Sequence, residues 1–386
     1  MSDTIKLALV GCGGMMGAHS RGMERLWPHG IRPFQVVATC DVMRESAEKM
    51  AAHVASYQGE KPAVFTDLVA MLKEMPEIDA VDISVQHDQH HTTALPCIAA
   101  GKHVLIEKPL AMTMRSGKAI LDAAGKSGKA FMVAENYRRS PEERAINWAI
   151  KSGRIGKLRQ LYWIDVGESL GAWGWRDRVE IAGGGWSMDG GVHFADLFRY
   201  HIGPVESMYA VSKQQNPTRY LNRETMSDPV EATVEDCTMA VLTFENGVVG
   251  TWISSKSAPG KSFNSRVLYG EKGSITWGAG LETRDEKVTI AELVEQYRKS
   301  LSPAESARLF PAGMEDTIAI ELTEFADAIN SGRAVETNGI EGYKALAISL
   351  SIYESEATSA QVRLADVEAL KVEAYQQRFN ALIGAG

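Results

Sequence analysis

Short apolar runs alternate with segments of helical periodicity along the first third of the chain. Such runs are typical of strands buried on both faces, and short strand–helix–strand connections favour parallel pairing. The pattern therefore predicts a doubly wound parallel sheet over residues 1–135. The predicted strands cover residues 5–10, 34–40, 78–85, 102–106 and 130–134, and the predicted helices cover residues 43–55, 67–74, 91–100 and 114–127.

The pattern changes after residue 135, because predicted strands now follow one another without helices between them. Asn246-Gly247 between two β-rich runs is a strong hairpin signal, so this second sheet should be largely antiparallel. The polar, poorly patterned residues 210–237 read as a long loop. Residues 136–386 form the second predicted domain. Its strands cover residues 158–166, 238–244, 248–254, 266–269 and 274–277, and a helix covers residues 315–330 and stops at Gly332.

Bulk composition narrows the class of protein. A length of 386 residues suits two domains, and 45% hydrophobic and 23% charged residues are ordinary for a soluble globular enzyme. A formal net charge of -8 argues against a nucleic-acid or anionic-membrane partner. The four cysteines have no paired spacing, and neither a secretory signal nor an apolar run of transmembrane length is visible. The cytoplasm is the expected compartment.

A glycine-rich turn, GCGGMMG at residues 11–17, directly follows the first predicted strand. Its first glycines let the backbone approach a pyrophosphate, and the next helix offers its N–H groups. Met16 stands where the GxGxxG pattern has its third glycine. Asp41 ends the second predicted strand, where a carboxylate binds ribose hydroxyls and repels a 2′-phosphate, which favours NAD. The nearby Arg44 leaves NADP as an alternative cofactor. The candidate cofactor contacts are Gly11, Gly13, Gly14, Met15, Met16, Asp41, Arg44 and Val85.

Glu107-Lys108-Pro109 follows an apolar run at the carboxyl end of a predicted parallel strand, the edge where ligands bind in such sheets. An X–Pro bond can be cis, which would hold the lysine in one direction. A solvated strand-to-helix loop is the alternative interpretation of the same tripeptide.

A second glycine-rich segment, GGGWSMDGGVHFAD, covers residues 183–196. Asp189 and His193 are four residues apart, so on a helix they share one face, and such a histidine is a suitable proton acceptor. Gly190 and Gly191 each cost a helix about 1 kcal/mol relative to alanine, which indicates close approach of a ligand or another backbone. A glycine-rich loop with a surface His–Asp pair is the alternative.

Together these segments resemble the glucose–fructose oxidoreductase / inositol dehydrogenase (Gfo/Idh/MocA) family over nearly the whole chain, with AAGKHVLIEKP at residues 99–109 and the 183–196 segment as the most specific matches. The resemblance implies a Rossmann domain joined to an α/β domain whose large open sheet forms a homodimer or homotetramer interface. By position, it implies that Lys108 contacts the reacting oxygen and Glu107 the nicotinamide ribose. His193 would be the general acid/base, Asp189 would bind substrate or orient His193, and His90 would lie near the nicotinamide.

Three other segments carry candidate chemistry. His87-Asp88-Gln89-His90-His91 looks like a metal cluster, but no partner at ligand spacing is predicted elsewhere, so no metal is expected. Trp173, Trp175 and Arg176 suit a sugar-binding wall or, equally, a packed aromatic loop. Arg138 is interpreted as structural.

The predicted function is an NAD(P)-dependent dehydrogenase or reductase, which exchanges hydride with a CH–OH carbon of a sugar, inositol or sugar derivative. A redox-assisted glycosidase or lyase is the second hypothesis. A non-catalytic NAD-sensing regulator is the third, and it is disfavoured because such a protein has no need of Lys108 and His193.

Overall fold

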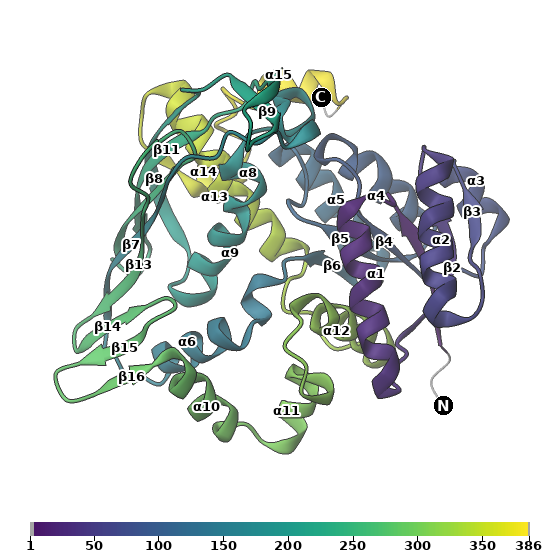
Figure 1. Cartoon of the computed structure of the whole chain (residues 1–386), viewed down its shortest axis with the longest axis horizontal. Coiled ribbons are helices and arrows are strands. Elements are labelled where there is room, and N and C mark those ends of the chain that lie inside the picture. The colour runs from purple at the N-terminus through teal and green to yellow at the C-terminus, as the bar shows by residue number, and fades with distance from the viewer. Residues whose placement is uncertain (1–3, 385–386) are drawn as a thin grey trace. The chain divides into compact units, whose positions relative to one another are not determined.

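A computed structural model describes residues 4–384, and the chain divides into two compact units (Figure 1). The first unit comprises the chain up to Ala111, then Ser116–Ser140 and Ser302–Gly342. The second comprises Met112–Arg115, Pro141–Leu301 and the chain from Tyr343 onward. The chain therefore passes between the units several times, and residues 302–342 pack with the first unit although they follow most of the second in sequence.

The first unit is built on a six-stranded sheet in which every neighbouring pair is parallel, as predicted. The strand order is β3-β2-β1-β4-β5-β6. The pattern missed β3, whose three residues are half-buried or exposed at the sheet edge and so give little hydrophobic signal. The strands are β1 (Ile5–Val10), β2 (Phe34–Cys40), β3 (Ala63–Phe65), β4 (Ala80–Ile83), β5 (His103–Glu107) and β6 (Phe131–Ala134).

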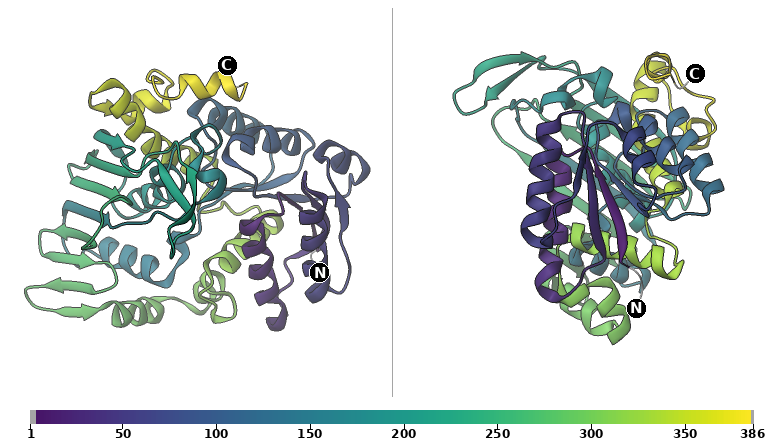
Figure 2. Two further views of the ribbon diagram at one scale, coloured as in Figure 1. Left: turned by 45° about the horizontal axis from the view of Figure 1, so that its top comes forward. Right: turned by 90° about the vertical axis from the view of Figure 1, so that its right-hand side faces the viewer.

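Helices cover this sheet, and one of them comes from the late segment. Leu322 and Phe325 of α12 are fully buried and share a hydrophobic cluster with Met16 and Phe34. Figures 1 and 2 show α12 beside α1. As predicted, α12 ends at Gly332, which adopts the left-handed conformation. The helices are α1 (Gly14–Leu26), η1 (Trp27–His29), α2 (Arg44–Gln58), α3 (Leu68–Glu74), η2 (His87–Gln89), α4 (His90–Ala99), α5 (Met114–Ser127), η3 (Tyr137–Arg139), α11 (Pro303–Leu309), η5 (Pro311–Gly313) and α12 (Thr317–Ser331).

The second unit contains a nine-stranded sheet in the order β16-β15-β14-β13-β7-β12-β11-β8-β17. Its pairs are antiparallel except for β7 and β12, which confirms the mostly antiparallel prediction. The strands are β7 (Leu158–Val166), β8 (Val205–Lys213), β11 (Cys237–Phe244), β12 (Val249–Ser255), β13 (Phe263–Gly270), β14 (Gly273–Thr276), β15 (Gly280–Thr283), β16 (Lys287–Thr289) and β17 (Val362–Arg363).

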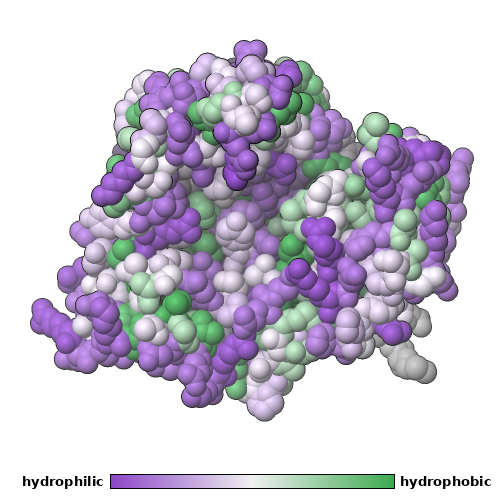
Figure 3. Space-filling model, viewed as in Figure 1, coloured by the Kyte–Doolittle hydropathy of each residue, from purple (hydrophilic) through white to green (hydrophobic). Residues whose placement is uncertain are grey.

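One face of the nine-stranded sheet carries the core of this unit. Trp163 and Trp252 project from β7 and β12, are fully buried, and both pack edge-on against Phe198 of α9. At the β16 edge, the turn at residues 284–286 is charged and exposed, and Figure 3 shows that end of the sheet as hydrophilic. The helices are α6 (Pro141–Lys151), η4 (Gly174–Asp177), α7 (Val179–Ala182), α8 (Trp186–Asp189), α9 (Gly191–His201), α10 (Ile290–Ser300), α13 (Gly339–Thr358), α14 (Leu364–Glu368) and α15 (Gln377–Leu382).

Residues 210–237 are not the long loop that their polarity suggested. They contain the end of β8 and an antiparallel pair, β9 (Thr218–Asn222) and β10 (Ser227–Glu231). Nearly all side chains of this pair are half-buried or exposed, so backbone pairing forms it without a hydrophobic alternation that a sequence could reveal. Among the described helices, none is both long and apolar enough to cross a membrane.

Candidate active site

The glycine turn after β1 leaves open space at the start of α1. Gly11 has a φ of 82°, and a Cβ there would lie 2.8 Å from Val85 Cγ1, so only glycine fits. Around Gly13 and Gly14, by contrast, no atom lies within 4 Å of a Cβ position. The first turn of α1 has neither a side-chain cap nor an acidic residue. This open, positive helix terminus fits the pyrophosphate of a dinucleotide.

Met16 explains the departure from the glycine pattern. Its side chain is fully buried in the cluster that includes Phe34 and Phe325. A side chain at this position therefore points into the core, and α1 packs through it instead of through a glycine. The substitution affects helix packing and leaves the ligand-facing turn intact.

The carboxylate of Asp41 lies beside the glycine turn. Its Oδ2 accepts a hydrogen bond of 2.7 Å from the N–H of Cys12, and its Oδ1 accepts one of 2.8 Å from Met43. Both bonds come from the backbone, so the carboxylate is fixed beside the glycine turn and keeps lone pairs for hydroxyl groups. Arg44 is exposed, with its guanidinium 3.7 Å from Glu48 one helical turn away. The residues present therefore fit NAD.

Glu107 belongs to a buried charge chain that the sequence did not predict. Nδ1 of His19 lies 2.8 Å from Asp82, and its Nε2 lies 3.0 Å from Glu107 Oε1. The other oxygen of Glu107 accepts a hydrogen bond of 3.0 Å from the N–H of Lys108. Burial opposes a charge on His19, but Asp82 and Glu107 outweigh it and raise the pKa of His19 well above its ordinary value. A cationic His19 thus pairs with both carboxylates and orients Glu107.

Lys108 follows Glu107 in sequence, and His90 lies near Glu107 in space. The Lys108–Pro109 peptide bond is cis, and Lys108 is half-buried. His90 is fully buried, with its Nε2 3.3 Å from the carbonyl oxygen of Val85. Burial, assisted by His87, lowers the pKa of His90 to about 3, so its ring is neutral. Within residues 4–384, no three His, Cys, Asp or Glu side chains gather as a metal-holding group.

The second unit holds Asp189 and His193. Asp189 ends α8, His193 lies in the first turn of α9, and Gly190 between them keeps helical dihedral angles, so the two residues follow one helical path. Both side chains are buried. Nε of Arg176 donates a hydrogen bond of 3.0 Å to Asp189 Oδ1. The structure therefore brings Asp189 and Arg176 together, whereas Lys108, Glu107 and Asp41 belong to the first unit.

The glycines beside Asp189 make room for indole rings. A Cβ on Gly190 would lie 2.6 Å from the ring of Trp186, and one on Gly191 would lie 2.7 Å from the ring of Trp252. The sequence predicted close approach of a ligand or another backbone, and the prediction was wrong about the partner: the groups nearest to these helical glycines are indole side chains of the same unit.

The aromatic loop before this segment is packed and also partly open. Trp173 stacks on Trp186 with ring centroids 5.3 Å apart, while 44% of Trp173 stays exposed. The guanidinium of Arg176 lies 4.3 Å from the ring centre of Trp175. The loop is therefore packed, as the second interpretation predicted, and the sugar-binding wall stays a prediction. Arg138 is buried and donates to the carbonyl oxygen of Glu336 at 3.2 Å, as a structural residue would.

His19 and Asp82 are the main residues that sequence reasoning missed. Asp82 offered a signal, because a carboxylate inside a fully buried strand needs a charged or hydrogen-bonding partner. The partner could not be named, since His19 is 63 residues away in sequence.

The fold and this site define an NAD-binding oxidoreductase. Residues 5–135 match the family described as "Oxidoreductase family, NAD-binding Rossmann fold", and residues 144–276 match "GFO/IDH/MocA C-terminal domain". The chain therefore belongs to the GFO/IDH/MocA oxidoreductase family.

Several relatives match nearly end to end. A levoglucosan dehydrogenase of Pseudarthrobacter phenanthrenivorans is 28% identical over 396 residues, which cover 95% of this chain and 100% of that protein. Inositol 2-dehydrogenase 2 of Saccharopolyspora erythraea is 27% identical, and the match covers 95% of this chain and 98% of that protein. Among solved structures, levoglucosan dehydrogenase in complex with NADH and levoglucosan has a TM-score of 0.75 at 26% identity, and the match covers 94% of this chain and 100% of that one.

Proposed function

We propose that this oxidoreductase is an NAD-dependent dehydrogenase of a secondary alcohol on a sugar, an inositol or a sugar derivative. The observation that carries the proposal is the open N-terminus of α1 beside the fixed carboxylate of Asp41, which fits a dinucleotide that lacks a 2′-phosphate. The names of the relatives, a sugar dehydrogenase and an inositol dehydrogenase, support the substrate class.

The proposed chemistry divides the work between cofactor and side chains. The bound nicotinamide supplies the redox chemistry by accepting hydride from the carbinol carbon. His193 takes the hydroxyl proton as general base, and the positive charge of Lys108 stabilises the oxygen as that proton leaves. Glu107, held by His19, contacts the nicotinamide ribose. Asp189, held by Arg176, binds a substrate hydroxyl or orients His193.

Absorbance of reduced nicotinamide, with a panel of sugars and polyols and with NAD or NADP, tests this function. We expect net NADH formation with NAD, and a loss of kcat of about 10²–10⁴-fold in His193→Ala, the usual contribution of a general base. NADH binding by that variant, measured by fluorescence, should change little. His29→Ala, at an exposed position of the first unit, is the matched control.

Three results would contradict the proposal. If the protein bound neither NADH nor NADPH, it could not be a nicotinamide-dependent enzyme. If a His193→Ala/Lys108→Ala double variant kept full activity, neither residue would have the proposed catalytic role. Turnover of a glycoside without net NADH would favour a redox-assisted glycosidase or lyase.

We further propose that the enzyme is a cytoplasmic homo-oligomer that assembles through the outer face of the nine-stranded sheet. That face is apolar where a monomer would be polar, and neighbouring strands align its side chains, for example Tyr209 beside Val241 and Val211 beside Met239. Its exposed large apolar residues are Tyr162, Tyr209, Val211, Met239, Val241, Val249, Phe263 and Tyr269.

Sedimentation velocity tests the assembly. A charge at the centre of this face should break it, so Val241→Lys should sediment as a monomer while the unchanged protein sediments as a dimer or tetramer. Val69→Lys, at an exposed position of the first unit, is the control and should leave the sedimentation coefficient unchanged. An unchanged protein that is monomeric at micromolar concentration would contradict the proposal.

A further inference from the structure

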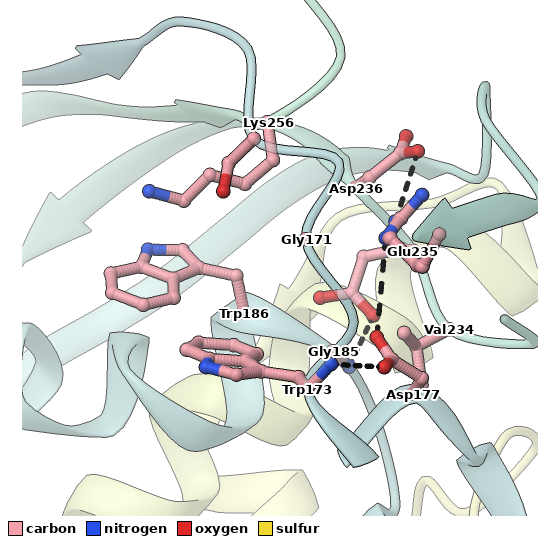
Figure 4. A pocket seen from close by; sticks show the side chains of 11 residues that line it. Gly171, Trp173, Asp177, Gly185, Trp186, Val234, Glu235, Asp236 and Lys256 are labelled. Carbon is pink, nitrogen blue, oxygen red and sulfur yellow. Dashed lines mark hydrogen bonds and ion pairs between the residues drawn. The ribbon is translucent and has the colours of Figure 1, made fainter. Parts of the chain in front are cut away.

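A cavity of about 130 Å³ lies within the second unit, beside the aromatic loop (Figure 4). It is therefore large enough to hold several waters or a polar group of a ligand. Two stacked indoles, a lysine and several carboxylates line it, chiefly Trp173, Trp186, Lys256, Asp177, Glu235 and Asp236.

The carboxylates of this cavity already have protein donors. Glu235 accepts hydrogen bonds from the N–H groups of Gly185 and Ser187 and from the hydroxyl of Tyr353 at 2.9 Å. Asp177 accepts from the N–H of Trp173. For Asp236, the donors are two backbone N–H groups at 2.8 Å each and a guanidinium at 3.3 Å, from Gln215, Asn216 and Arg219. Protein donors therefore already hold each of these carboxylates in place.

Two donors of the cavity lack an acceptor. Nζ of Lys256 lies 4.1 Å from the ring centre of Trp186 and, among the described residues, has no hydrogen bond or ion pair. The indole N–H of Trp186 is buried and has no hydrogen-bond partner within the described chain. Figure 4 shows the nitrogen of Lys256 next to the ring nitrogen of Trp186.

Nearby charges do not offset the cost of burying the ammonium group of Lys256. The carboxylate whose charge favours the ammonium of Lys256 is Asp165, and Asp165 makes a bidentate pair with Arg266 at 2.9 and 3.0 Å. Burial therefore dominates, with Arg266 adding to it, and lowers the pKa of Lys256 below its ordinary value. An ammonium in this position gains stability from a ligand that brings a negative charge.

The cavity is also close to the proposed catalytic residues of this unit. Trp186 begins the four-residue helix α8 that ends at Asp189, a distance of about 5 Å along a helix. The ring of Trp186 also lies 6.4 Å from that of Phe194, the residue after His193. The cavity-lining Trp186 and the proposed catalytic residues Asp189 and His193 thus belong to one short helical stretch of the chain.

We propose that Lys256 and the indole N–H of Trp186 bind a carboxylate of the substrate, so that the preferred substrate is an acidic sugar. One ammonium and one N–H match a group with a single negative charge, whereas a phosphate carries about −1.5 to −2 and needs more donors. The stacked indoles add an apolar wall for the sugar ring. This inference rests on the proposed dehydrogenase function and names its substrate class.

Kinetics with paired sugars test it. The ratio of kcat/KM for D-glucuronate to kcat/KM for D-glucose should exceed one in the unchanged protein. In Lys256→Met it should fall at least about tenfold, the loss expected for a hydrogen bond to a charged group. Lys256→Arg keeps the charge and should restore most of the ratio. Lys261→Met, at an exposed position nearby, should leave it unchanged. Glucose 6-phosphate in the same assay distinguishes a phosphate site.

Binding separates this inference from the function on which it rests. Titration with glucuronate in the presence of NADH, followed by indole fluorescence, should show binding that weakens about tenfold in Lys256→Met and also weakens with added salt. Charge-dependent binding without NADH formation would refute the dehydrogenase function and keep the carboxylate site. NADH formation with a glucuronate-to-glucose ratio that Lys256→Met does not change would refute the site alone, as would a preference for glucose 6-phosphate.

Discussion

The two glycine-rich segments look alike in sequence but use their missing side chains in opposite ways. Gly13 and Gly14 of the first unit have no atom within 4 Å of a Cβ position, so the space beside them is open. Gly190 and Gly191 of the second unit meet indole rings at 2.6 and 2.7 Å, so their space is already filled by the protein. A glycine run therefore indicates close approach, and only the structure tells whether the approaching group is a ligand or a side chain.

The two segments also differ in the residues that support them. The helix after the first segment carries His19, which forms buried ion pairs with Asp82 and Glu107. Aromatic rings back the second, with Trp186 and Trp252 against the helix that carries His193. The stability of the first unit should thus depend on pH and on substitutions that change a buried charge. The stability of the second unit should depend on substitutions that change side-chain volume.

Removal of the buried cation should have the largest effect. His19→Leu leaves two carboxylates buried without their partner, which should lower the free energy of unfolding by about 3–5 kcal/mol. The pKa of His19 is raised in the folded state, so its contribution is complete below its unfolded value of about 6.5 and is lost as the pH rises through the folded value. Urea unfolding from pH 6 to pH 10 should show this loss in the unchanged protein and not in the variant.

The control for that measurement is His53→Gln, which alters a half-exposed histidine 3.7 Å from Glu24. It should change stability by no more than about 0.5 kcal/mol. An equal effect of the two substitutions would show that the buried charge chain contributes nothing specific to the first unit.

Added volume should have a smaller effect, and only in the second unit. Gly191→Ala places a methyl group against Trp252 and should lower the free energy of unfolding by about 1–3 kcal/mol, because the core there is full. In the first unit, Gly13→Ala meets open space, so stability should stay within about 0.5 kcal/mol while NADH affinity falls. Chemical denaturation and NADH fluorescence measure both. Equal stability losses for the two variants would remove the distinction between the segments.

Most of the fold and half of the site could be predicted from the sequence. Buried parallel strands and the glycine turn follow from local patterns, as do Asp41 at a strand end and the hairpin at Asn246-Gly247. The β9–β10 pair could not be predicted, because its side chains are largely exposed. Nor could the pairing of Asp82 with His19 or the position of Lys256 over Trp186, since each joins residues far apart in sequence.

The late helix α12 has a consequence for the order of synthesis. Its Leu322, Phe325 and Ala326 belong to the same cluster as Met16 and Phe34, so this hydrophobic core cannot be complete until residue 326 has left the ribosome. At about 5–20 residues per second, the roughly 190 residues between β6 and residue 326 take about 10–40 s to make. During that interval the nascent nucleotide-binding sheet has an unfinished apolar surface, and most of the second unit is synthesised before the first can close.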